Sequence, residues 1–141
     1  EYGEVDNPCV VFDIDGTIII DGIFAPKNYD QLVSGVYEFV KYLQDNNIPI
    51  FIVTARPDYA HNRKKTAEML YDIGINYTYL YMWDGDNFDN PTDFKTEARK
   101  DIYLNHYDCV MSLGDNIWDY GDYGGIGVHI YNDGESYEFV N

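Results

Sequence analysis

Basic residues are scarce in this chain, and no run of apolar residues is long. The 141 residues include 9 Lys and Arg against 25 Asp and Glu, which gives a formal net charge of -16. Nucleic acids and anionic membranes attract basic surfaces, so this charge excludes broad adhesion to either of them. A membrane-spanning helix needs about 20 consecutive apolar residues, and no such run exists. We therefore expect no membrane association and no extended nucleic-acid interface.

Cysteine is nearly missing as well. The only two, Cys9 and Cys109, each stand inside an apolar run. Two residues cannot build the disulfide framework of a small secreted domain, so we expect two buried thiols, with a single disulfide as the alternative. No secretory segment is visible, which favours a cytoplasmic protein, although the chain begins at Glu1 and a leader could have been removed.

Apolar residues, in contrast, are plentiful. Hydrophobic residues make up 45% of the chain and aromatic residues 17%, whereas a disordered acidic tail would be poor in both. A chain of this length buries enough surface to fold without disulfides or a structural metal. We expect residues 1–141 to form a single domain.

Five short apolar runs predict strands that are buried on both faces, and three patterns between them place apolar residues at helical spacing. The predicted strands are residues 8–14, 49–54, 77–82, 108–113 and 126–131, and the predicted helices are residues 30–44, 58–73 and 96–105. Strands that alternate with helices indicate a parallel sheet with right-handed crossovers. The predicted fold is therefore α/β, with a doubly wound, Rossmann-like sheet of about five strands.

Unusual polar residues follow three of the predicted strands. They are Asp13, Asp15, Gly16 and Thr17 after the first, Thr54, Ala55 and Arg56 at the end of the second, and Gly114, Asp115, Asn116 and Asp119 after the fourth. In an open parallel sheet, ligands bind beyond the carboxyl ends of the strands, near the point where the strand order reverses. We therefore predict one functional site at this edge.

The chemistry of these residues suits a hard divalent cation. Asp13 and Asp115 supply carboxylate oxygens, the ligands that Mg²⁺ prefers, and no His or Cys is spaced to offer a softer alternative. Asp13 and Asp15 form a pair that can divide the work between an ionised nucleophile and a proton donor. Gly16 allows a tight turn that leaves backbone N–H groups free to face an anion.

A hydroxyl and a lysine complete the set. Seven of the nine basic residues lie in the stretches 56–65 and 95–100, which indicates an anion site in an otherwise acidic chain. Thr54 offers a hydroxyl, and a lysine from the second stretch could neutralise a phosphate oxygen. Cation, carboxylate nucleophile, hydroxyl and lysine together predict phosphoryl transfer.

The order of these motifs resembles that of the phosphatases in the haloacid dehalogenase superfamily. The four motifs are Asp13-Ile14-Asp15-Gly16-Thr17, Phe51-Ile52-Val53-Thr54, Lys95 at the start of a helix, and Gly114-Asp115-Asn116-Ile117-Trp118-Asp119. The chain is more closely similar to the acid phosphatase branch. That similarity depends on Thr54-Ala55-Arg56-Pro57 followed by Arg63 and Thr66, and on Phe94-Lys95-Thr96 followed by Arg99. Ala55 stands where that branch usually has Gly, and Trp118 stands one place later.

The resemblance implies a two-step phosphatase mechanism. Asp13 would attack phosphorus, and Asp15 would protonate the leaving oxygen and then activate water. Mg²⁺ would be held by Asp13, the main-chain carbonyl of Asp15, and Asp115. The phosphoryl oxygens would be bound by Thr54, Ala55 and Lys95, with supporting roles for Gly16, Thr17, Arg56, Asn116 and Asp119. Two acids in the first motif favour a phosphatase over a dehalogenase.

Residues 18–29 and 83–94 lie where family members insert a cap domain, and each segment is too short to fold by itself. We expect a capless site with residues 18–26 as a hairpin flap, open to phosphomonoesters such as nucleotides or sugar phosphates. Two alternatives stay open: a polynucleotide 3′-phosphatase, and a non-catalytic relative that binds metal or phosphate or serves in storage. The oligomeric state is left open too.

Overall fold

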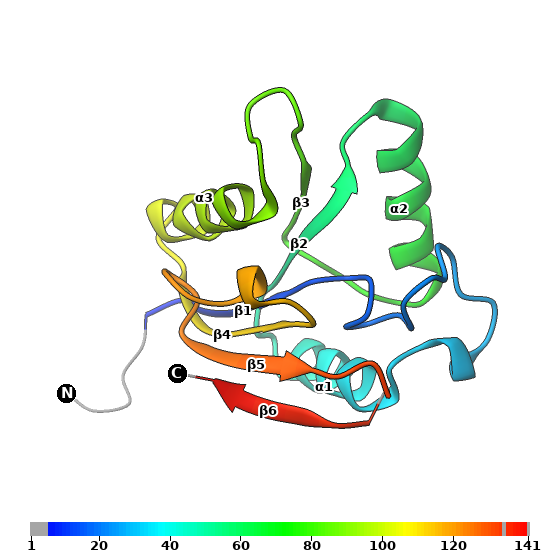
Figure 1. Ribbon diagram of the computed structural model, residues 1–141. Coiled ribbons are helices and arrows are strands. Elements are labelled where there is room, and N and C mark those ends of the chain that lie inside the picture. The colour runs from blue at the N-terminus through cyan, green and yellow to red at the C-terminus, as the bar shows by residue number, and fades with distance from the viewer. Residues whose placement is uncertain (1–5, 134, 141) are drawn as a thin grey trace.

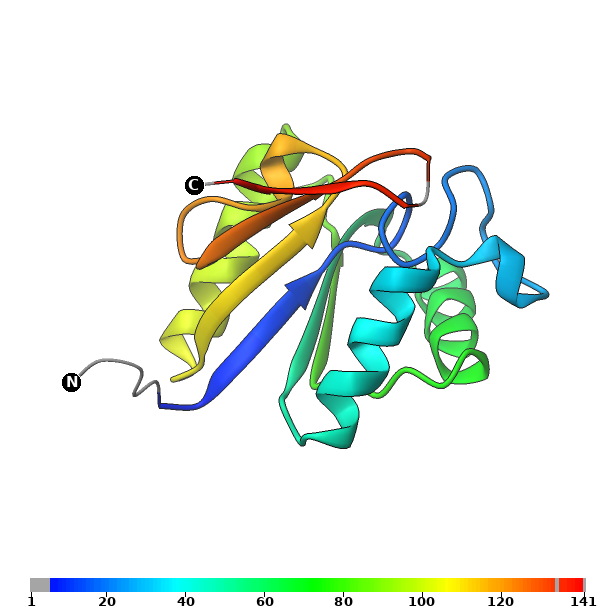
Figure 2. The same cartoon turned by 90° about the horizontal axis from the view of Figure 1, so that it is seen from below.

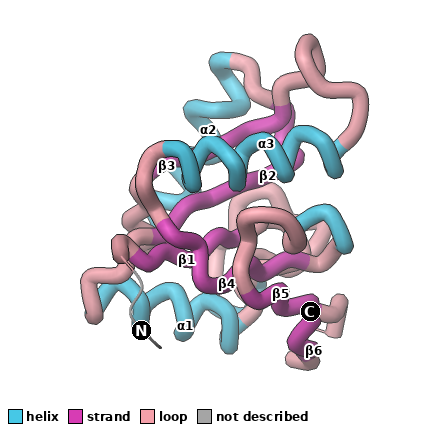
Figure 3. Tube along the Cα trace, turned by 90° about the vertical axis from the view of Figure 1, so that its left-hand side faces the viewer, coloured by secondary structure: helices cyan, strands magenta, loops and turns pink. Residues whose placement is uncertain are grey.

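The computed structural model describes residues 6–133 and 135–140 and confirms an α/β fold built on one sheet. Six strands follow one another in the order β3-β2-β1-β4-β5-β6 (Figure 1, Figure 3). They are β1 Pro8–Phe12, β2 Ile50–Pro57, β3 Tyr79–Trp83, β4 Asp108–Gly114, β5 Ile126–Ile130 and β6 Tyr137–Val140. All neighbours are parallel except β5 and β6, which are antiparallel.

Helices cover both faces of the sheet, as a doubly wound fold requires (Figure 2). They are α1 Ser34–Asp45, α2 Ala60–Asp72 and α3 Pro91–Leu104. Side chains of β1 alternate between the two faces: Val10 and Phe12 join the core beneath α1 and α2, and Cys9 and Val11 join the core beneath α3. This double burial explains the uninterrupted apolar run. Within the described ranges, no helix combines the length and apolarity needed to cross a membrane.

The sixth strand was not predicted from the sequence. β6 has four residues and runs antiparallel along β5, with Phe139 opposite Val128 and Tyr137 opposite Ile130. Both aromatic side chains are more than 60% exposed. A strand this short that buries so little carries no clear apolar pattern, so only its pairing with β5 defines it.

Helix α3 begins earlier than its predicted start at residue 96. The Asn90 side chain accepts a hydrogen bond from the backbone N–H of Asp93 at 2.9 Å, which caps the helix. Pro91 occupies the first helical position, where its missing N–H has no cost. Lys95 therefore lies in the second turn of α3 rather than before it.

Residues 18–26 do not form the predicted hairpin. Ile18 and Ile19 are fully buried in the core, and Ile19 makes isolated bridges to Asp15 and Leu32. Burial of each of these side chains stabilises the fold by about 1.5–3 kcal/mol. A hairpin that projected into solvent would leave them exposed and lose this stabilisation. Residues 21–25, which follow these two buried side chains, form turns and bends and no paired strand. No cap domain is present in the part of the chain that the structure describes.

The two cysteines lie directly opposite each other on β1 and β4. Both are free thiols, Cys9 buried and Cys109 half-buried. They lie at the start of their strands, at the opposite end of the sheet from the polar residues described next.

Candidate active site

Three parallel strands end at one edge of the sheet and bring together polar residues that are far apart in the sequence. β1 has β2 on one side and β4 on the other, so the strand order reverses at β1. Asp13 follows β1, Thr54 lies in the second half of β2, and Asp115 follows β4. In doubly wound sheets this reversal marks the usual ligand site.

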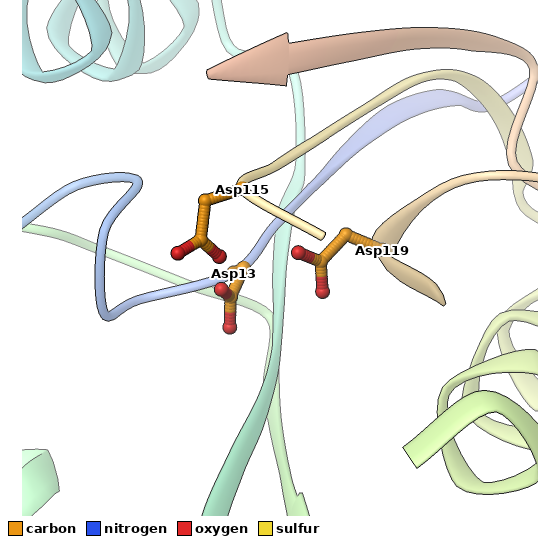
Figure 4. A group of neighbouring side chains, drawn as sticks. All are labelled: Asp13, Asp115 and Asp119. Carbon is orange, nitrogen blue, oxygen red and sulfur yellow. The ribbon is translucent and has the colours of Figure 1, made fainter. Parts of the chain in front are cut away.

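Three carboxylates crowd together at this edge (Figure 4). One oxygen from each of Asp13, Asp115 and Asp119 lies within 4.8 Å of the other two. Asp13 and Asp119 are buried, and Asp115 is half-buried. Asp115 can approach because Gly16 has no side chain: a Cβ at this position would lie 2.2 Å from the Asp115 Oδ2 atom. The backbone of Gly16 also has φ +77°, which glycine adopts without strain.

The crowding disfavours full ionisation of the three carboxylates. Burial, together with the nearby Asp13 and Asp119, raises the pKa of Asp115 to about 7. Burial and Asp13 also raise the pKa of Asp119 to about 6, although Lys95 acts in the opposite direction. Like charges in a partly dry site favour the protonated forms. A divalent cation would remove this repulsion, so the group has the character of a cation site.

Lys95 is the one lysine that reaches into this group among the described residues. Its side chain is 2% exposed and extends from α3. The Nζ atom donates to Asp13 Oδ1 at 2.9 Å and also to Asp119 Oδ1. Burial acts to lower the pKa of Lys95, but the two carboxylates outweigh it and the net shift is upward. Lys95 is therefore held as a cation beside Asp13.

Asp15 lies outside the three-carboxylate group and is held by Arg56. The Nε and Nη2 atoms of Arg56 donate to the two Asp15 carboxylate oxygens at 2.9 and 2.8 Å. The same guanidinium donates to the carbonyl oxygen of Phe24 at 2.9 Å, and the Phe24 ring centre lies 4.2 Å away. A two-pronged pair of this kind fixes the plane of the carboxylate. Arg56 thus joins Asp15 to the loop that was predicted as a flap.

The β2 residues of the predicted phosphate site reach the same edge. Thr54 is fully buried, and its Oγ1 atom accepts the backbone N–H of Arg56 at 3.1 Å. Because that bond uses an oxygen lone pair, the Thr54 hydroxyl proton stays available for an anion. Ala55 is exposed at the end of the strand.

The remaining predicted residues support the carboxylates. Thr17 donates to Asp13 Oδ2 at 3.5 Å, a long contact. The Asn116 side chain donates to Asp115 Oδ1 at 3.1 Å, and its backbone N–H donates to Asp119 Oδ2 at 2.9 Å. Each of the three clustered carboxylates therefore accepts a hydrogen bond from at least one neighbouring polar group.

One supporting residue, Arg99, contributed to the family resemblance but was not among the predicted site residues. Arg99 is 2% exposed and donates to the carbonyl oxygens of Trp118 at 3.0 Å and Asp122 at 2.9 Å. These bonds hold the segment that carries Asp119. The signal in the sequence was the spacing of Arg99 four residues after Lys95, which places both on one face of a helix.

Comparisons with known proteins identify a family and a fold. The model of the family described as "HAD superfamily, subfamily IIIB (Acid phosphatase)" matches residues 3–130. A chain of the Pnkp1/Rnl/Hen1 complex superposes with a TM-score of 0.64 and 23% identity, over 82% of this chain and 42% of that one. A chain of the Pnkp1/Rnl/Hen1 RNA repair complex gives 0.60 and 21%, over 84% and 40%. No curated protein matches. The chain spans about two fifths of the length of these two structures, and at such identities the likeness shows the fold alone.

Proposed function

The chain belongs to subfamily IIIB of the HAD superfamily, the acid phosphatases, and we propose that it hydrolyses phosphomonoesters in two steps through an aspartyl-phosphate on Asp13. The observation that carries this proposal is the position of Lys95, whose Nζ atom lies 2.9 Å from Asp13 Oδ1. A phosphoryl group that approaches Asp13 would meet a fixed cation at the attacking atom. Arg56 holds Asp15 apart from this group, and in this proposal Asp15 serves as the proton donor.

A divalent cation fits beside Asp13 and Asp115, in the three-carboxylate group whose third member, Asp119, is paired with Lys95. Three carboxylates face one lysine, and burial together with the neighbouring Asp13 and Asp119 raises the pKa of Asp115. In this proposal Mg²⁺ would be held by Asp13, Asp115 and the main-chain carbonyl of Asp15, all of them oxygen ligands. When bound, the ion would supply positive charge that draws the phosphoryl group to the carboxylate edge.

In the first step Asp13 is the nucleophile. One of its carboxylate oxygens bonds to phosphorus while the bond between phosphorus and the leaving oxygen breaks. Lys95 and the Thr54 hydroxyl would bind the phosphoryl oxygens and offset their charge. Asp15 gives its proton to the leaving oxygen, so the alcohol departs neutral.

In the second step Asp15 acts as a base. A water molecule attacks the phosphorus of phospho-Asp13 and transfers a proton to Asp15, which releases inorganic phosphate and restores Asp13. The Asp15 side chain is 36% exposed, so leaving groups and water can reach it. Its two hydrogen bonds from Arg56 keep the carboxyl group in one position through both steps.

Turnover of p-nitrophenyl phosphate tests these roles. The wild type should release p-nitrophenol with Mg²⁺ and stop in EDTA. Asp13→Asn should be inactive. Asp15→Asn should release about one equivalent of p-nitrophenol and then stall, since this leaving group departs without a proton but the intermediate still needs a base. Its steady-state rate should fall by about 10²–10⁴-fold.

Asp72→Asn is the matched control, because Asp72 is an exposed residue at the end of α2 and the variant makes the same change in charge. It should behave as the wild type. Equal rates for the wild type and Asp13→Asn would refute the nucleophile assignment. Mg²⁺ binding without turnover of any phosphomonoester would favour the non-catalytic alternative.

A polynucleotide 3′-phosphatase is the second candidate. The fold likeness to chains of an RNA repair complex supports it, as does the absence of a cap domain over the described site. The net charge of -16 opposes it, because a long polyanion would be repelled. A panel of nucleotides, sugar phosphates and 3′-phosphorylated oligonucleotides separates the two. A preference for the oligonucleotide that weakens steeply with salt would favour this second function.

A further inference from the structure

A groove of about 550 Å³ runs along the edge strand β3. Most of its lining lies on the face of the sheet that α3 covers, and Met82 of β3 and Arg63 of α2 border it from the other face. Two of the elements that line it, α3 and β3, lie next to each other in Figure 1. The aromatic side chains that line it are Phe51, Tyr79, Tyr81, Phe88, Phe94 and Tyr107. Tyr79 and Tyr81 meet edge to face with ring centres 4.8 Å apart, and Tyr79 is 52% exposed. None of the three clustered carboxylates of the candidate active site lines this groove.

The charges of the groove are unbalanced. Asp58, Asp84 and Asp101 line it together with one cation, Arg63. Arg63 is paired with Asp58 through contacts of 2.9 and 3.3 Å and also donates to the carbonyl oxygen of Leu80 in β3 at 3.1 Å. Asp84 and Asp101 therefore leave the groove with an excess of negative charge.

Both of these carboxylates are held in place. Asp101 accepts a hydrogen bond of 2.7 Å from the Tyr81 hydroxyl, and burial together with this bond raises the pKa of Tyr81, so the proton stays on the tyrosine. Asp84 accepts a bond of 2.6 Å from the Asn87 side chain, which lowers the pKa of Asp84 and keeps it ionised. The groove thus presents hydrogen-bonded anions beside aromatic side chains, surroundings that favour an ammonium or guanidinium group.

The groove also borders an unpaired strand edge. β3 has β2 on one side only, so every second residue of β3 directs its backbone groups to the open side. A chain added there would continue the sheet, and its alternate side chains would lie on the face of the groove.

We propose that this groove binds an extended segment of a partner protein, in which Lys or Arg alternates with apolar residues, as a further strand beside β3. The strand edge supplies backbone hydrogen bonds, and the rings with Asp84 and Asp101 select basic side chains. A second copy of this chain is a poor occupant, because two bodies of net charge -16 repel each other. The proposal does not depend on the phosphatase reaction.

Binding of a fluorescein-labelled peptide of alternating lysine and valine tests the proposal by anisotropy. A peptide of alternating glutamate and valine is the charge control, and a lysine–valine peptide with N-methylated backbone amides is the strand control. Only the unmodified basic peptide should bind. Hydrogen exchange should then slow at the backbone amides of β3, and not at those of β6, the other edge of the sheet.

Two variants locate the contact. Asp101→Asn can still accept the Tyr81 hydrogen bond and should weaken binding of the basic peptide by about two- to fivefold. Asp72→Asn changes the net charge equally from outside the groove and should leave the affinity unchanged. Equal effects of the two variants would overturn the proposal, since attraction would then be to the net charge alone. Equal affinity for the N-methylated peptide, or no binding near 1 mM, would overturn it as well.

Discussion

Replacing Lys95 with Met tests how the candidate active site is held together. Methionine has a similar length and no charge, so the change removes the cation and keeps the volume of a side chain that is 2% exposed. Asp13, Asp115 and Asp119 would then face one another without the lysine that now contacts two of them. We expect a large loss of stability in the absence of a divalent cation.

The size of the effect follows from the contact between Lys95 and Asp13. Two unit charges 2.9 Å apart attract each other by about 6 kcal/mol at an effective dielectric constant of about 20. The cost of removing both charges from water offsets part of this attraction, but loss of one partner leaves the other buried and unpaired. Such losses are about 3–5 kcal/mol. For a chain of this size, the melting temperature should fall by about 10 °C.

Urea unfolding followed by tryptophan fluorescence in EDTA measures this change. The double variant Lys95→Met/Asp119→Asn should regain part of the stability, because one of the stranded carboxylates is then neutral. Mg²⁺ should stabilise Lys95→Met more than the wild type. Equal urea midpoints for Lys95→Met and the wild type in EDTA would refute the reasoning, as would a double variant that loses the sum of both single effects.

Three further perturbations act on the same site. In EDTA, the raised pKa values of Asp115 and Asp119 mean that the folded protein holds protons that the unfolded chain has lost, so this component of stability falls as pH rises from about 4 to 7. Urea midpoints across this range should show a smaller fall for Asp115→Asn, and parallel curves would contradict the assignment. Gly16→Ala should lower Mg²⁺ affinity and turnover by at least about tenfold, since its Cβ would lie 2.2 Å from Asp115 Oδ2; unchanged Mg²⁺ titrations would argue against the close approach. Arg56→Lys keeps the charge but not the two-pronged bond, so kcat should fall by about tenfold or more with little change in KM; an equal rise in KM would instead indicate substrate binding.

The fold could be predicted from local patterns because a strand buried on both faces has to be apolar along its whole length. The run that became β1 and the polar residues that follow it, such as Asp13, are read directly from neighbouring positions. The start of α3 is also encoded locally, in the Asn90 cap and in Pro91, whereas the spacing of apolar residues alone predicts a later start. The burial of Ile18 and Ile19 depends on a core assembled from distant segments, so no local pattern could distinguish it from a hairpin.

For the site, the sequence alone determined which chemical groups lie at the ends of the strands, since parallel crossovers bring these ends to one edge. Only the tertiary structure decided which of these side chains pair with one another. Lys95 and Asp13 are 82 positions apart, and Arg56 and Asp15 are 41 apart. Asp119 joins Asp13 and Asp115, while Asp15 pairs with Arg56 outside that group. The distances between such side chains depend on how the helices and turns pack against the sheet. Spacing along the chain does not encode these distances.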